Sequence, residues 1–229
     1  MKSRGLLSRL LYHTPLFTLV AARYPYFFTP AQLAFLCDCL DETLNLPGCV
    51  VEVGCARGAT TIFLNRHLQA RGIQKPYYAL DTFTGFTRRD VSHEVEARGK
   101  STSLDTHFTV NDQRWFDRSM QLAGCRNVHS IKCDAGAFDY SSLGPIALAL
   151  CDVDLYLPTK SALKGTYDNL LPGGLIVCDD CVSSGPYDGA LLAYREMVAE
   201  SGSAERIVHE KLGVIAKPQP GSVGERAHA

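Results

Sequence analysis

Apolar residues along the chain follow two patterns, short continuous runs and longer stretches with helical spacing. The apolar runs predict strands at residues 49–53, 77–80, 146–151 and 175–178, and residues 128–132 predict another short strand. Segments with helical spacing lie around them, at residues 30–44, 60–72, 111–123, 158–170 and 188–201. Because helices and strands alternate, we expect a mostly parallel, doubly wound α/β sheet with right-handed crossovers.

Three regions depart from this alternation. Pro172-Gly173-Gly174 predicts a turn before the fifth strand, and residues 206–210 and 214–217 predict a hairpin at the sheet edge. Residues 82–111 are polar and lack clear periodicity, so we expect the least structured part of the chain there, serving as a lid. We divide the chain into an N-terminal helical segment that packs on the core (1–46), one domain (47–218) and a frayed tail (219–229).

The composition fits a globular protein without an electrostatic partner. Of 229 residues, 46% are hydrophobic and 21% are charged, and the formal net charge is −1, so we expect no binding to nucleic acid.

The nine cysteines are an odd number, and several lie in apolar runs, which favours a reduced, cytoplasmic protein. Cys178 and Cys181 have the spacing of a redox or zinc pair. The two aspartates between them would raise the thiol pKa, and no second pair lies at zinc-ligand spacing.

The first 22 residues are basic and partly apolar. Residues 16–22 are too few to span a bilayer, so we expect no stable membrane insertion. Four leucines within residues 6–11 recur at helical spacing between arginines. This pattern favours core packing over weak association with a membrane surface. We expect a docking helix here, or an arm that joins copies of the chain in a homo-oligomer.

Candidate ligand-binding residues follow the predicted strands at their carboxyl ends. The positions after the five strands are Gly54, Asp81, Asp134, Asp152 and Asp179. In an open α/β sheet, ligands bind at this edge. Residues that are distant in sequence should therefore converge on one site.

The turn after the first strand is typical of a nucleotide-like cofactor. Gly54 and Gly58 permit close backbone approach, and the next helix directs its positive end toward the ligand. The sequence lacks the glycines of a dinucleotide turn and a phosphate-binding G-x-x-x-x-G-K-[ST] run, which favours S-adenosylmethionine, an adenosine cofactor without phosphates. Glu52 would favour its cationic groups, and Asp81 would accept its ribose hydroxyls. The candidate cofactor residues are Glu52, Gly54, Ala56, Gly58, Thr60, Asp81, Thr82, Asp134 and Ala135, the last two near the adenine.

Four aspartates, Asp152, Asp154, Asp179 and Asp180, follow two neighbouring buried strands. Their like charges would raise one another's pKa unless a cation lies between them, and carboxylate oxygens suit Mg²⁺. Asp152 and Asp154 would share a face of extended chain, one as a ligand and Asp154 as the base that takes a hydroxyl proton. Lys160 is a second candidate base, although its place one turn into a helix favours a solvated or ion-paired side chain.

With these residues assembled, the chain resembles class I S-adenosylmethionine-dependent methyltransferases. More narrowly, it resembles the macrocin O-methyltransferase family, which acts on sugars and macrolide glycosides. The matching stretches are VVEVGCARGATT, ALDTFTGF, CDVDLYLPTKSAL and LPGGLIVCDD. The resemblance implies a seven-stranded Rossmann-like sheet with an antiparallel last strand. It also implies magnesium ligands at Asp152, Asp179 and Asp180, a base at Asp154 and cofactor contacts at Glu52, Gly54, Gly58 and Asp81.

We therefore predict a Mg²⁺-assisted O-methyltransferase that acts on a hydroxyl of a glycosyl group or another small natural product. A methyltransferase of catechol or phenol acceptors would place its metal-binding acids at the same strand ends and is the alternative among enzymes. A non-catalytic S-adenosylmethionine-binding module, with residues 82–111 as a partner surface, is the alternative outside them.

Overall fold

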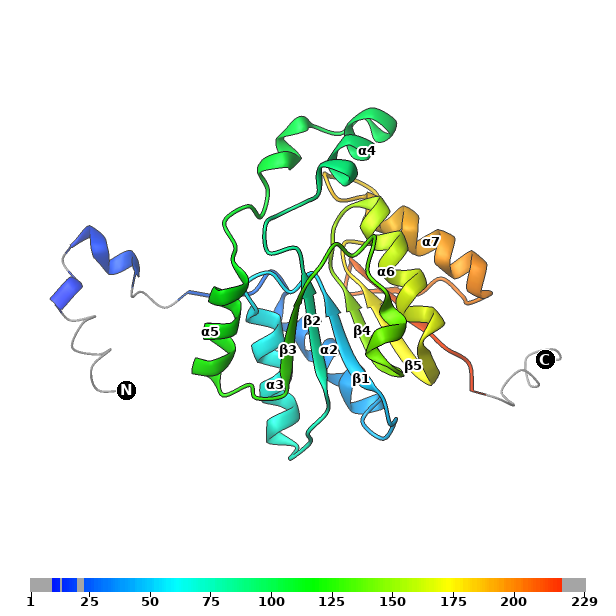
Figure 1. The fold of residues 1–229 in the computed structure, drawn as a ribbon, viewed down its shortest axis with the longest axis horizontal. Coiled ribbons are helices and arrows are strands. Elements are labelled where there is room, and N and C mark those ends of the chain that lie inside the picture. The colour runs from blue at the N-terminus through cyan, green and yellow to red at the C-terminus, as the bar shows by residue number, and fades with distance from the viewer. Residues whose placement is uncertain (1–9, 13, 20–22, 220–229) are drawn as a thin grey trace.

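The computed structural model describes residues 10–12, 14–19 and 23–219, and a seven-stranded sheet forms its centre (Figure 1). Across the sheet the strands are β3 (Val128–Lys132), β2 (Tyr77–Asp81), β1 (Cys49–Val53), β4 (Ile146–Cys151), β5 (Leu170–Cys178), β7 (Leu212–Ala216) and β6 (Ile207–Val208). The first five in this order are parallel, whereas β7 is antiparallel to β5 and β6. The doubly wound, seven-stranded sheet and its terminal hairpin are thus confirmed.

Helices cover both faces of the sheet, because its central strands are apolar on both sides. One face carries α6 (Tyr156–Asp168) and α7 (Gly189–Ser201), and the other carries α2 (Pro30–Glu42), α3 (Ala59–Ala70) and α5 (Gln113–Ala123). In β4, Ala149 and Cys151 pack with the first group, and Leu148 and Leu150 pack with the second. A continuous apolar run is what a strand buried on both faces requires.

Helix α2 begins where the sequence predicts it. Thr29 and Gln32 form a reciprocal capping box, and Pro30 fills the first turn. The buried Leu36 and Leu40 attach this helix to the core. A short helix, η1 (Pro15–Leu19), precedes it. Much of the predicted dimer arm and nearly all of the predicted tail lie outside the described residues, so both stay predictions.

Two predictions about helices and turns are wrong. Within residues 82–111, α4 (Arg88–Arg98) and η2 (Thr102–Thr106) form, because Thr87 caps α4 and apolar side chains of this segment bury against Leu155. We call residues 82–111 the cap; it lies beyond the carboxyl edge of the sheet (Figure 1). Pro172-Gly173-Gly174 belongs to β5, where pairing with β4 shifts register. A side chain at Gly174 would lie 2.9 Å from the Ala147 carbonyl oxygen, so glycine permits this close irregular pairing.

The cysteines are unpaired thiols of the interior. All nine are free, and burial raises the pKa of Cys39, Cys133 and Cys151 to about 12. Cys181 donates a hydrogen bond to the Cys178 carbonyl at 3.6 Å. In the described part of the chain, no helix is both long and apolar enough to cross a bilayer.

Candidate active site

The register of the strands brings the predicted site residues to one edge of the sheet. Val53 of β1 lies opposite Leu80 of β2 and Cys151 of β4, and Cys151 lies opposite Cys178 of β5. The residues that follow these four positions stand in a row: Gly54, Asp81, Asp152 and Asp179. Backbone hydrogen bonds fix the row, since Asp152 N–H donates to the Val53 carbonyl at 2.8 Å and Asp179 N–H to the Cys151 carbonyl at 2.9 Å.

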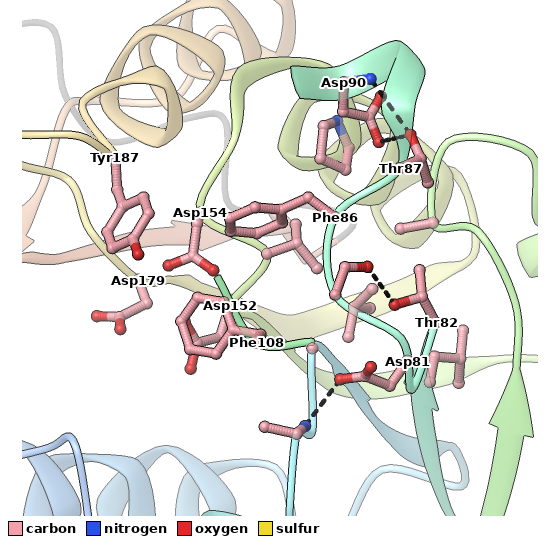
Figure 2. Close-up of a pocket in the computed structure, with 18 of the residues that line it drawn as sticks. Asp81, Thr82, Phe86, Thr87, Asp90, Phe108, Asp152, Asp154, Asp179 and Tyr187 are labelled. Atoms are coloured by element: carbon pink, nitrogen blue, oxygen red, sulfur yellow. Dashed lines mark hydrogen bonds between the residues drawn. The ribbon is translucent and has the colours of Figure 1, made fainter. Parts of the chain in front are cut away.

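A cavity of about 300 Å³ opens at this edge, under the cap. In Figure 2, Asp81 and Thr82 lie toward one end, and the carboxylates of Asp152, Asp154 and Asp179 lie toward the other. The predicted residues that line the cavity are Gly54, Ala56, Asp81, Thr82, Asp134, Ala135, Asp152, Asp154, Asp179 and Asp180. Three predicted residues, Glu52, Gly58 and Thr60, do not line it. The structure therefore brings together most of the candidate site.

Close backbone contact shapes the wall at the first two strands. Gly54 has φ +91°, and a Cβ there would lie 1.8 Å from the Asp152 carbonyl oxygen, so only glycine lets β1 and β4 meet in this way. Asp81 accepts hydrogen bonds from Ala56 N–H at 2.8 Å and Phe83 N–H at 2.6 Å. Burial raises the pKa of Asp81, and these two bonds oppose that rise. The carboxylate is thereby held at the cavity wall.

Glu52 lies beneath the turn and not in the cavity. The hydroxyls of Thr61 and Tyr77 each donate to its Oε2 at 2.6 Å. Burial raises the pKa of Glu52 to about 7, although both hydrogen bonds lower it. This network ties β1 to α3 and β2. The predicted contact between Glu52 and the cofactor stays a prediction.

The other predicted cofactor residues fall into two groups. Gly58 caps α3 with φ +82° and packs against Phe116 and Met120, and Thr60 lies in the first turn of that helix. Asp134 lies at the wall, where its Oδ1 accepts hydrogen bonds from Gly136 N–H at 2.8 Å and from the Arg89 guanidinium at 3.5 Å. Since Arg89 belongs to α4, this contact joins the cap to the turn after β3.

The acid cluster comprises Asp152, Asp154, Asp179 and Asp180 and fills the opposite end of the cavity. Burial raises the pKa of Asp152 and of Asp154 well above the ordinary range. The neighbouring carboxylates raise both further, and Asp154 shares a hydrogen bond with Asp180. Such a cluster retains a proton at a pH where an isolated aspartate would have lost it.

The backbone is strained at two of these acids. Asp154 has φ +62° and Asp180 has φ +54°, values that side-chain-bearing residues rarely adopt. Leu155 N–H donates to the Val153 carbonyl at 2.6 Å, which closes a tight three-residue turn at Asp154. The extended chain predicted through Asp154 is therefore wrong. Strained residues of this kind cluster at functional sites.

Lys211 supplies a cation to the acid cluster that the sequence analysis did not identify. Its Nζ lies 2.7 Å from Asp179 Oδ2 and 3.2 Å from Asp180 Oδ1, and 4.9 Å from the centroid of the Phe28 ring. Burial lowers the pKa of Lys211, but the two carboxylates raise it overall, so the side chain is an ammonium. The available signal was a basic residue in the hairpin that follows the acid-bearing strand. Recognising it required knowing that this hairpin pairs with β5.

The acid cluster fits Mg²⁺ in its donor chemistry. It offers carboxylate oxygens, and Asp179 Oδ1 is buried without a hydrogen-bond partner in the described structure. In the arrangement described, no three histidine, cysteine or acidic side chains of residues 10–12, 14–19 and 23–219 converge as ligands of one ion. Lys160, the second candidate base, does not line the cavity and pairs with Glu196 at 2.8 Å.

Three aromatic rings wall the cavity beside the acid cluster, and we call Phe86, Phe108 and Tyr187 the aromatic trio (Figure 2). Their ring centroids lie 5.4 Å (Phe86 to Phe108), 6.2 Å (Phe86 to Tyr187) and 6.3 Å (Phe108 to Tyr187) apart. The Tyr187 hydroxyl lies 2.7 Å from His107 Nδ1. Burial and the charge of Asp154 raise the pKa of Tyr187 to about 12, so the phenol is neutral. Phe86 ends the ALDTFTGF stretch that carries the family resemblance, although it was not predicted as a site residue, and Phe108 and Tyr187 come from segments without periodicity.

Known proteins resemble this chain in sequence pattern and in fold. The model of the macrocin O-methyltransferase (TylF) family matches residues 30–207. No curated protein matches the chain. The crystal structure of CalS11, a calicheamicin methyltransferase, is similar with a TM-score of 0.69 and 20% identity, over 94% of this chain and 91% of that one. The structure of the O-methyltransferase NovP is similar with a TM-score of 0.66 and 18% identity, over 82% of this chain and 79% of that one. An apo structure of CalS11 is described as a TDP-rhamnose 3'-O-methyltransferase of calicheamicin biosynthesis. Its TM-score is 0.61 and its identity 18%, over 94% of this chain and 93% of that one.

Proposed function

The chain belongs to the macrocin O-methyltransferase family and is a class I S-adenosylmethionine-dependent methyltransferase; from this premise we propose that it methylates a hydroxyl of a glycosyl group or another small natural product. One observation carries the proposal. A strained, half-buried Asp154 lies in the same cavity as the Gly54 turn and Asp81. A cofactor wall and a candidate base thus share one enclosed space. CalS11 is described as acting on TDP-rhamnose, and its rhamnose unit supports a glycosyl acceptor. Whether the acceptor of this chain also carries a nucleoside diphosphate depends on the charges of its own cavity.

We assign the end of the cavity near Gly54 to the methyl donor. Asp81 would accept hydrogen bonds from the ribose, with Gly54, Ala56 and Thr82 beside it. Asp134 and Ala135, at the turn after β3, would contact the adenine. The Arg89 contact with Asp134 supports a cap that covers this end.

Asp154 is proposed as the general base. It would take the proton of the acceptor hydroxyl while the oxygen attacks the methyl carbon and the carbon–sulfur bond breaks, leaving a neutral thioether. Burial and its acidic neighbours raise the pKa of Asp154, and a carboxylate with a raised pKa accepts a hydroxyl proton more readily. Asp152, two residues earlier at the end of the same strand β4, would support this step.

Asp152, Asp179 and Asp180 would hold Mg²⁺. When bound there, the ion would lower the pKa of the acceptor hydroxyl. The buried, unpartnered Oδ1 of Asp179 supports this assignment. Calorimetry of S-adenosylhomocysteine and MgCl₂ binding, together with turnover in MgCl₂ and in EDTA, tests it. We expect saturable Mg²⁺ binding and loss of turnover in EDTA, whereas full turnover in EDTA would remove the metal from the proposal.

The variant Asp154→Asn tests the base. We expect turnover, measured as S-adenosylhomocysteine formation, to fall by about 10²- to 10⁴-fold. The dissociation constant of S-adenosylmethionine should stay nearly unchanged, because Asp154 lies at the acceptor end. Retained turnover in this variant would contradict the assignment.

A catechol or phenol acceptor is the second candidate, because the aromatic trio would also stack on a phenolic ring. Acceptor profiling with glycosides and catechols separates the two.

The nine unpaired cysteines support a reduced, cytoplasmic location.

A further inference from the structure

We infer that the acceptor is an uncharged molecule with a flat C–H or aromatic face beside its reacting hydroxyl, and that the cavity rejects nucleoside diphosphate sugars. This inference rests on the proposed function and narrows its substrate class. It follows from two independent properties of the cavity, its charge and its aromatic wall.

The charges of the cavity oppose a phosphate group. At the acceptor end, the four carboxylates of the acid cluster face one ammonium, that of Lys211. Among the described residues that line the cavity, Lys211 is the only basic one. With the proton that the cluster retains, a bound divalent cation would bring this group to neutrality, so no excess positive charge would face a phosphate group. Phosphate sites in proteins use arginine or lysine groups that are free to donate, whereas Lys211 already donates to Asp179 and Asp180.

The aromatic wall favours an apolar face on the acceptor. Phe86, Phe108 and Tyr187 line the cavity together, and the Phe108 side chain is 42% exposed although other rings of the chain are fully buried. An exposed ring that lines a cavity offers dispersion contacts to a sugar C–H face or an aromatic ring. Phe27, 84% exposed, lines the same cavity and extends the apolar surface.

The hydroxyl of Tyr187, the one polar side-chain group of the aromatic trio, already contacts a histidine. The Tyr187 hydroxyl lies 2.7 Å from His107 Nδ1. His107 thereby holds the hydroxyl in place, and Tyr187 presents its ring to the acceptor. An acceptor would find its hydrogen-bonding partners in the acid cluster and its packing surface in the trio.

Matched probes test the inference. The protein, loaded with S-adenosylhomocysteine and MgCl₂, is examined by saturation-transfer difference NMR with 4-nitrophenyl hexosides and with nucleoside diphosphate derivatives of the same hexoses. Catechol serves as a purely aromatic probe. We expect at least one of the neutral probes to bind at least tenfold more tightly than any nucleoside diphosphate sugar. Comparing the binding of the hexosides with that of catechol then shows whether the cavity prefers the C–H face of a sugar or an aromatic ring.

Variants of Phe108 link this preference to the trio. Phe108→Ala should weaken the neutral probe by about tenfold, and Phe108→Leu, which keeps apolar bulk without the ring, should weaken it less. Trp115→Ala is the matched control, because Trp115 is also an exposed aromatic residue (58%) but does not line the cavity. S-adenosylhomocysteine affinity should stay unchanged in all three variants.

Several outcomes would overturn the inference. These are equal or tighter binding of a nucleoside diphosphate sugar, no binding of any neutral probe, or a Phe108→Ala variant that behaves like Trp115→Ala. If S-adenosylhomocysteine itself failed to bind, the proposed function would fail instead, so the two failures are distinguishable.

Discussion

At Asp154, a left-handed backbone, a half-buried carboxyl and an acidic hydrogen-bond partner occur together. Each feature costs folding free energy, because the backbone conformation is strained and burial of like charges is unfavourable. A position selected for stability alone would carry none of them. The combination is expected where a carboxylate must be aimed at a reacting group and kept ready to accept a proton.

Replacement of Asp154 by glycine and by alanine separates strain from charge. Both variants lack the carboxyl, so they differ only in the Cβ atom that a positive φ disfavours. We expect Asp154→Gly to be about 1 kcal/mol more stable than Asp154→Ala in chemical denaturation. At a position with an ordinary backbone, the glycine variant would be less stable than the alanine variant. If Asp154→Gly were the less stable variant here, no backbone strain would be stored at residue 154.

Glu52 predicts a pH-dependent stability. Its pKa rises from 4.5 to about 7 on folding, so the folded state favours the protonated form. This contribution is fully present below pH 4.5 and is lost as pH rises through about 7. The variant Glu52→Gln keeps an oxygen that accepts from Thr61 and Tyr77 but cannot ionise. Relative to the wild type, it should gain stability between pH 4.5 and 7, up to about 3 kcal/mol above pH 7.

The measurement is urea denaturation of both proteins from pH 4.5 to 8, with the exposed glutamate variant Glu96→Gln as the control. A constant difference across this range would contradict the prediction. Calorimetry with S-adenosylmethionine on Glu52→Gln also tests the predicted contact with the cofactor, because a buried structural role alone would leave the affinity nearly unchanged.

At the scale of elements, the cap is anchored by a buried ion-pair network. Glu94 of α4, 1% exposed, accepts from Tyr156 N–H at 2.7 Å and pairs with Arg98 at 2.7 Å. Arg98 and Lys100 both pair with Asp188, just before α7. The cap thus attaches to the starts of α6 and α7 and carries Phe86 and Phe108 with it.

The variant Arg98→Met should loosen the cap, because Glu94 would lose its partner while staying buried. We expect the opening free energy of α4 to fall by about 2 kcal/mol, or roughly 30-fold faster amide exchange. Hydrogen exchange monitored by mass spectrometry measures this, with the exposed Arg88→Met as the control. Unchanged exchange in α4 would show that the apolar contacts with Leu155 hold the cap alone.

How well an element could be predicted depended on where its stability comes from. The strands β3 and β4 match the predicted residues. For β4 the reason is a continuous apolar run, which defines a strand buried on both faces. Helix α4 was missed, since Val91 and Val95 are nearly its only apolar residues and its stability comes from Thr87, ion pairs and packing on distant elements. Pro172-Gly173-Gly174 was read as a turn because irregular pairing inside a strand has the same glycine signal as a turn.

For the whole molecule, topology explains which part of the site was predictable. Asp81, Asp152 and Asp179 follow strand ends, and the rule that ligands bind at the carboxyl edge of a parallel sheet locates them without a structure. Lys211 and the aromatic trio reach the cavity through the hairpin and the cap. Their placement depends on tertiary packing, which no local pattern encodes.

The variant Lys211→Met tests how much the ion pair of Lys211 with Asp179 contributes to the stability of the folded protein. Asp179 is 4% exposed, so losing the ammonium leaves a buried charge without compensation. We expect a loss of about 3 kcal/mol at neutral pH by denaturation, most of it recovered in the double variant Lys211→Met/Asp179→Asn. The surface pair of Lys164 and Asp168 provides the control, because Lys164→Met should cost less than about 0.5 kcal/mol. Equal losses in the two single variants would contradict a buried role for Lys211.

The position of Lys211 also has a consequence for the order in which the molecule assembles. The acids of the cluster follow β4 and β5, whereas their cation lies just before β7. This strand is the last in the chain to be synthesised, and it must insert between β5 and β6. During synthesis, the cofactor wall and all four acids emerge before Lys211. During synthesis the four aspartates therefore lack the Lys211 ammonium until the final hairpin docks, and completion of the site coincides with completion of the sheet.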